Sequence, residues 1–229
     1  MVLIIKRWIL YISGVFFLSS GVSLSILADF GVSPVSALAY ALSLVTGLSV
    51  GLMAFAANIL YLILQDCLNK SVPWKEHAFQ LILSVLFGLF INLTLAVLEF
   101  VLPPSPGLLL RVLYLICSLF VIAFGLFFLF SSKLPVLPYD GLTYAISRFF
   151  KWSVGKAKVN SDLVNVTVAA AICLSFLRQL GSIGLGTLVS AVFIGRILGL
   201  FMNIFGQGLA KWLVKTHREK PGQIFVDGQ

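Results

Sequence analysis

The sequence predicts an all-α membrane protein with six long transmembrane helices and two short half-helices, and three observations lead to this prediction. The chain of 229 residues is 60% hydrophobic and only 10% charged, whereas soluble domains carry about 25% charged residues. Six apolar stretches are long enough to cross a bilayer, which takes roughly 20 apolar residues each. Two shorter apolar stretches each begin at a proline. This composition excludes an ordinary soluble domain.

The six long stretches occupy most of the chain. They lie at about 7–28, 51–68, 78–101, 108–131, 160–178 and 183–206. The first is longer than the apolar region of a cleaved signal peptide, which spans about 7–15 residues. We therefore expect it to be retained as the first membrane helix.

The two short stretches, 35–46 and 139–150, follow Pro34 and Pro138. Twelve helical residues reach about 18 Å, which is well short of a bilayer core of about 30 Å. We expect two half-helices that either re-enter the membrane or lie at its interface. The alternative is that both cross, which would give eight spans.

The distribution of positive charge favours six spans. With six spans, 13 of the 16 lysines and arginines fall on the side of the two termini, and with eight spans about 11 do. Because cytoplasmic loops are enriched in these residues, both termini are predicted to be cytoplasmic. The net charge is +8, and the lysines and arginines lie between apolar runs and in the basic tail 207–229. This pattern indicates contact with anionic lipid rather than nucleic acid.

The chain contains an internal repeat with an offset of 104 residues. Gly31–Gly51 and Pro135–Gly155 share nine identical residues in 21 positions. The halves are therefore 1–103 and 104–206, and each contains three long stretches. Because three crossings are an odd number, the second half is predicted to have the inverted orientation, an arrangement frequent in transporters.

The starts of the half-helices are the predicted solute site. A helix N-terminus offers free N–H groups and a partial positive charge, which can bind an anion, a carboxylate or a polar solute. The candidate residues at these starts are Ser33, Pro34, Ser36, Pro138 and Asp140. The alternative is that both segments are interfacial elbows that bind nothing, since proline is common at helix starts.

Four further residues are candidates because they are polar and lie within apolar runs: Tyr40, Asn58, Tyr144 and Arg196. Arg196 lies about 15 Å from the inner end of the last span, and ionisable residues at that depth are usually functional. Alternatively, that span ends earlier and the arginine reaches the interface. Asp140 either pairs with Arg196, carries a proton, or caps its helix.

The repeated motif also carries a family resemblance. The run G-V-S-P-x-x-A-L-x-Y-x-L-S-x-x-T-G-L-S-V-G at Gly31–Gly51, with L-P-Y-D-G-L-T-Y-A-I-S at Leu137–Ser147, resembles the YczE/YitT group of small bacterial integral membrane proteins. The resemblance implies a multi-pass protein of the bacterial plasma membrane, in a group whose activity is largely unassigned. Relatives often carry Trp-Asp where this chain has Val35-Ser36, and the second motif keeps an acid at Asp140.

We therefore expect a secondary transporter or permease for a small polar or anionic solute, whose site lies between the two repeats. One alternative is a non-transporting accessory or assembly protein, and another is the substrate-capturing subunit of a multicomponent importer. Association with a second copy or with another membrane protein stays open. The three cysteines have no metal-ligand spacing and no catalytic constellation lies at membrane depth, so we expect neither a cofactor nor enzymatic activity.

Overall fold

The computed structural model describes residues 2–69, 73–103 and 107–214. Helices account for most of these residues, and no strand occurs among them. The helices are α1 (Val2–Ala28), α2 (Pro34–Thr46), α3 (Val50–Leu68), α4 (Trp74–Val101), α5 (Leu108–Ser132), α6 (Pro138–Phe150), α7 (Val154–Leu177) and α8 (Leu185–Val214). Six of them, all but α2 and α6, are long and apolar enough to cross a membrane. The predicted all-α membrane fold is confirmed.

The half-helices α2 and α6 have 13 residues each, which corresponds to about 20 Å and is too short for a bilayer core of about 30 Å. Each begins with a proline, whose missing N–H would have no helical partner at that position. Each ends at a residue with left-handed backbone, Gly47 with φ 72° and Lys151 with φ 54°. The expected ranges 35–46 and 139–150 agree with these bounds within one residue.

The C-terminal ends of the two half-helices make equivalent hydrogen bonds, offset by the same 104 residues. The Ser43 hydroxyl donates to the carbonyl of Leu48 at 2.7 Å, and the Ser147 hydroxyl donates to the carbonyl of Trp152 at 2.8 Å. The repeated sequence therefore forms the same local structure in both halves.

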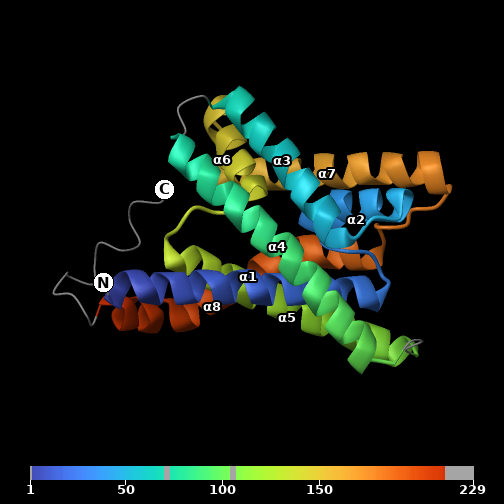
Figure 1. Cartoon of the computed structure of the whole chain (residues 1–229), viewed down its shortest axis with the longest axis horizontal. Helices are drawn as coiled ribbons and strands as arrows, with labels where there is room; N and C mark the ends of the chain where they lie inside the picture. Colours follow the sequence, from blue (N-terminus) through green and yellow to red (C-terminus); the bar gives the residue numbers. More distant parts are fainter. Residues whose placement is uncertain (1, 70–72, 104–106, 215–229) are drawn as a thin grey trace.

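Helices α1 and α5 pack closely against each other and run antiparallel (Figure 1). A Cβ atom on Gly14 would lie 2.8 Å from the backbone nitrogen of Leu129 and 2.9 Å from the carbonyl oxygen of Gly125. Further along α1, Gly21 lies against Ile122 in the same way. Small residues at these positions let the two backbones approach closely, as is common between membrane helices.

Consecutive long helices run in opposite directions (Figure 1). At one end of the molecule, Lys6 Nζ at the start of α1 donates to the carbonyl of Trp212 near the end of α8 at 2.8 Å. At the other end, Arg111 near the start of α5 pairs with Asp29 just after α1 at 2.8 Å. The start of α1 and the end of α8 therefore lie on the same side.

The start of α7 and the end of α8 differ most from the expected bounds, and α1 and α4 also begin five and four residues earlier than expected. Helix α7 begins at Val154 rather than at 160, because the hydroxyl of Ser153 caps its first turn by accepting from Lys156 N at 3.3 Å. Helix α8 continues to Val214 rather than ending at 206. The predicted basic tail 207–229 is thus helical at its start, and residues 215–229 lie outside the described part of the chain.

Candidate functional site

The half-helices begin at the middle of long helices that belong to the opposite half of the chain. Asn165, in the middle of α7, donates from Nδ2 to the carbonyl of Pro34 at 2.5 Å. Tyr139, at the start of α6, packs edge-on against Tyr61 of α3 with ring centroids 5.0 Å apart. Both α2 and α6 therefore start deep among the spans rather than at their ends.

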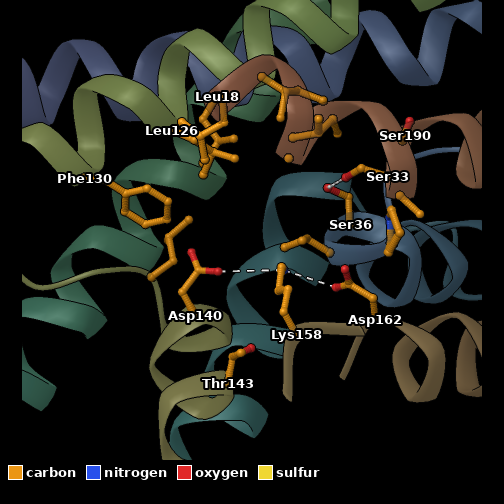
Figure 2. A pocket seen from close by; sticks show the side chains of 18 of the residues that line it. Leu18, Ser33, Ser36, Leu126, Phe130, Asp140, Thr143, Lys158, Asp162 and Ser190 are labelled. Carbon is orange, nitrogen blue, oxygen red and sulfur yellow. Dashed lines mark hydrogen bonds and ion pairs between the residues drawn. The ribbon is translucent and has the colours of Figure 1, made fainter. Parts of the chain in front are cut away.

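A cavity of about 330 Å³ lies where these two starts meet α1, α4, α5, α7 and α8 (Figure 2). Its volume falls within the range of small-molecule sites, about 300–1,000 Å³. Its polar lining is supplied by Ser33, Ser36, Asp140, Thr143, Tyr144, Lys158, Asp162 and Ser190. Its apolar walls include Leu18, Val22, Phe87, Ile122, Leu126, Phe130, Ile194 and Leu198. Both half-helix starts thus reach one shared cavity.

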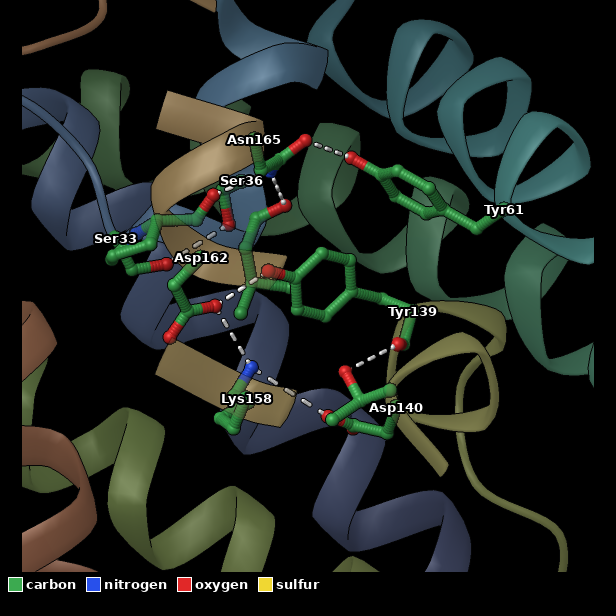
Figure 3. Close-up of polar contacts among 11 residues, drawn as sticks. Ser33, Ser36, Tyr61, Tyr139, Asp140, Lys158, Asp162 and Asn165 are labelled. Atoms are coloured by element: carbon green, nitrogen blue, oxygen red, sulfur yellow. Dashed lines mark hydrogen bonds and ion pairs between the residues drawn. The ribbon is translucent and has the colours of Figure 1, made fainter. Parts of the chain in front are cut away.

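The charged residues of the cavity lining form one cluster (Figure 3). Lys158 Nζ lies 3.1 Å from Asp162 Oδ1 and 3.8 Å from Asp140 Oδ1. Tyr139 donates its hydroxyl to Asp162 Oδ1 at 2.5 Å, and its ring lies 4.3 Å from the lysine nitrogen. The side chains of both aspartates are less than one-fifth exposed. With all three groups ionised, two carboxylates and one ammonium give this cluster a charge of −1.

A second polar group lines the cavity at the start of α2. The hydroxyls of Ser33 and Ser36 lie 3.3 Å apart, and Ser33, the residue before the helix, makes no side-chain cap. Ser190 of α8 is 1% exposed, and its hydroxyl has no hydrogen-bond partner among the described residues. In Figure 2, Ser190 lies on the same side of the cavity as Ser33 and Ser36, across from Asp140.

The structure brings five of the nine predicted site residues to the cavity: Ser33, Pro34, Ser36, Asp140 and Tyr144. Pro138 is buried beside it as the first residue of α6 and does not line it. Asn58 lines a neighbouring void of about 20 Å³ that shares Ser36 with the main cavity. Tyr40 packs instead against an apolar cluster between α2 and α7 that contains Ala37 and Cys173.

Arg196 does not reach the cavity. It is exposed on the outer side of α8, with its guanidinium 5.9 Å from the ring of Phe193. The cavity side of α8 is formed by the residues around it, such as Ile194 and Gly195. The pair between Arg196 and Asp140, one of the three alternative roles of Asp140, is not formed, and Asp140 pairs with Lys158 instead.

Sequence reasoning misses Lys158 and gives Asp162 no role in the site. It places Lys158 in a cytoplasmic loop because it starts the fifth long helix at residue 160. A signal is present in the sequence, since the two residues are four apart and lie on the same side of a helix. The capping serine at Ser153 would place both in the first turns of α7.

The cluster is suited to binding a charged group. Among the described residues no group of three histidine, cysteine, aspartate or glutamate side chains is close enough to hold a metal. The ammonium of Lys158 also occupies the space between the two carboxylates. The arrangement can exchange its internal ion pairs for pairs with a charged solute.

Comparisons with known proteins give a family without a stated function. A model described as a family of unknown function, DUF6198, matches residues 5–203. The chain is 28% identical to the "Uncharacterized membrane protein YczE" of Bacillus subtilis over 85% of each chain. It is 28% identical to the "Uncharacterized protein YyaS" of the same species over 86% of this chain and 93% of the relative.

A third relative, an "Uncharacterized protein" of Haemophilus influenzae, is 24% identical over 83% of this chain and 80% of its own length. No solved structure matches the chain. The resemblance to YczE that the repeated motif indicates is confirmed by these relatives.

Proposed function

The chain belongs to the DUF6198 family, and we propose that it is a small secondary transporter or permease, and not an enzyme, that carries a small polar or charged solute through the cavity. The family and the six apolar helices identify a membrane protein. The cavity and its ion-pair cluster support a transport role beyond membrane insertion.

One observation carries the proposal: the starts of both half-helices line the same cavity at the middle of the spans. Backbone that is not helical is tolerated at such depth only where protein or a water-filled cavity covers it. An ion-pair cluster at the same place is costly in a membrane and is expected to serve a solute or a coupled ion.

The proposed transport cycle uses the two halves, 1–103 and 104–206, as inverted repeats. Helix bounds and serine contacts repeat at an offset of 104 residues, and α1 and α5 cross antiparallel at glycines. Rocking of one half against the other around this crossing would open the cavity to each side in turn. We further propose that the protein lies in the bacterial plasma membrane with both termini cytoplasmic.

Reconstituted protein tests the proposal with a mixture of solutes, so that no single solute has to be chosen. Proteoliposomes are incubated with a ¹³C-labelled bacterial metabolite extract, washed, and analysed by mass spectrometry against empty liposomes. The proposal predicts that at least one labelled solute enters faster with the protein, and that Asp162→Asn abolishes this difference. Equal uptake by empty liposomes and proteoliposomes, in both insertion orientations, would contradict it.

One observation favours a second function, that of an accessory protein for another membrane protein. Little of α8 is buried within the molecule, and its exposed side carries Arg196 in the middle of an apolar helix. A partner helix with a carboxylate at that depth would cover this charge. Co-purification that is lost with Arg196→Leu, together with no uptake in proteoliposomes, would support this alternative.

A further inference from the structure

The cavity has an acidic end. Asp140, Lys158 and Asp162 are the charged residues of its lining, and their sum is −1 when all are ionised. A ligand that carries only a negative charge would meet this net charge with no cation left to pair with it. A ligand ammonium group, by contrast, would supply the missing positive charge.

The start of α2, which lies across the cavity from Asp140 (Figure 2), offers hydrogen-bond donors. Ser33 lies just before α2, is 4% exposed and leaves the first turn of the helix without a side-chain cap. Pro34 has no N–H, and the Ser36 N–H already donates to the Ser33 carbonyl at 3.0 Å, so the remaining N–H groups of this first turn are the ones that a ligand would satisfy. Ser190 adds a hydroxyl that is almost fully buried and has no partner among the described residues. A carboxylate would satisfy both the helix end and this hydroxyl.

The walls between the two ends are apolar. Leu18 and Val22 come from α1, Phe87 from α4, and Ile122 with Leu126 from α5. These side chains make no hydrogen bonds with a solute and gain by contact with hydrocarbon. A solute that fills the cavity therefore needs an apolar part beside its charged groups.

We propose that the cavity binds a small zwitterion of the amino-acid type, with its ammonium group at Asp140 and Asp162, its carboxylate at the start of α2 with Ser190, and its side chain against the apolar walls. This inference rests on the proposed function because it names the solute class of the same site. It also gives Lys158 a role: its ammonium occupies the acidic end until the solute's ammonium competes for the same carboxylates.

Binding of matched probes to the purified full chain tests the inference. The probes are alanine, leucine and phenylalanine, each compared with the amine that lacks its carboxylate and the acid that lacks its ammonium. Isothermal titration calorimetry gives the dissociation constants. At least one amino acid is expected to bind about tenfold more tightly than both of its counterparts, because each counterpart lacks one of the two charged contacts and a tenfold loss corresponds to about 1.4 kcal/mol.

Variants separate the two ends. The double variant Ser190→Ala/Ser36→Ala should weaken binding of the amino acid and leave binding of the amine unchanged. Asp162→Asn should weaken binding of both. Ser43→Ala, on the same helix but outside the cavity lining, is the matched control. Amino acids that bind no better than their amines or acids would overturn the inference. So would an uptake assay in which the transported solute is not a zwitterion, although that result would leave the proposed transport function standing.

Discussion

Tyr61 and Asn165, which lie 104 residues apart and hold equivalent positions in the two halves, form a direct hydrogen bond of 2.6 Å between the Tyr61 hydroxyl and Asn165 Oδ1. Asn165 also donates to the carbonyl of Pro34 at the start of α2. Through one asparagine, α3 of the first half and α7 of the second half hold the deep end of a half-helix. Both side chains are buried, at 6% and 5% exposure.

Replacing each partner should have a different effect on stability. Tyr61→Phe removes one hydrogen bond and should lower the free energy of unfolding by about 1 kcal/mol. Asn165→Leu leaves both the Tyr61 hydroxyl and the Pro34 carbonyl buried without a partner, and should cost about 2–3 kcal/mol. Chemical unfolding in detergent measures both. Equal losses would show that the contact to Pro34 contributes nothing.

Replacing Lys158 alone should destabilise the protein more than replacing Lys158 together with one of its carboxylate partners. Lys158→Met leaves Asp140 and Asp162 with uncompensated charge in a low-dielectric site, at a cost of about 2 kcal/mol. The double variant Lys158→Met/Asp162→Asn should recover part of this loss. Thermal unfolding of both variants checks the order.

The matched control is Lys156→Met, two residues earlier on the same helix. Lys156 is exposed and lies 4.7 Å from the ring of Trp152, so its loss should change stability by less than about 0.5 kcal/mol. A double variant that is less stable than Lys158→Met would contradict the ion-pair account.

The crossing of α1 and α5 should not tolerate a side chain at Gly125. Its Cβ would lie 2.8 Å from the carbonyl oxygen of Gly14 and from the Cα of Leu18, so the two backbones must separate. Gly125→Ala should cost about 1–3 kcal/mol. Gly199→Ala is the control, because nothing lies within 4 Å of its added Cβ. Equal melting temperatures of the two variants would mean that the helices are not packed as described.

Arg196 belongs to the site expected from the sequence and not to the cavity seen in the structure, so its replacement distinguishes the two. Because Arg196 is exposed on α8 and absent from the cavity lining, Arg196→Leu should leave solute uptake in proteoliposomes unchanged. Uptake that falls by tenfold or more, with normal folding shown by gel filtration, would place the arginine in the solute pathway.

Much of the fold could be predicted because membrane helices leave simple signals. Apolar length indicates the six spans, and Pro34 and Pro138 mark the starts of the half-helices within one residue. The identity between the two motifs also indicates that Ser36 and Asp140 hold equivalent positions. These signals are local, and they do not depend on how the helices pack.

The direction of individual side chains could not be predicted. Helix α8 is apolar around most of its circumference, so no amphipathic pattern tells which side Arg196 occupies. Lys158 is missed for the opposite reason, since a lysine near the start of a span usually anchors the interface. Only the packing of α6 against α7 brings Asp140 to it.

Cysteine accessibility of the two half-helix starts tests the central claim, that both reach one cavity inside the membrane. Ser36→Cys and Asp140→Cys, each in a background without Cys67, Cys117 and Cys173, are labelled with a membrane-impermeant maleimide added to one side at a time. Gly107→Cys and Lys151→Cys, at exposed positions between helices, give the rates of open loops at the two ends. We predict that both cavity positions react far more slowly than these loops, and that both react from the same side or sides of the membrane because they line one cavity. Labelling of Ser36→Cys and Asp140→Cys at the rates of the loop controls would contradict the account, because both half-helices would then lie at the membrane surface.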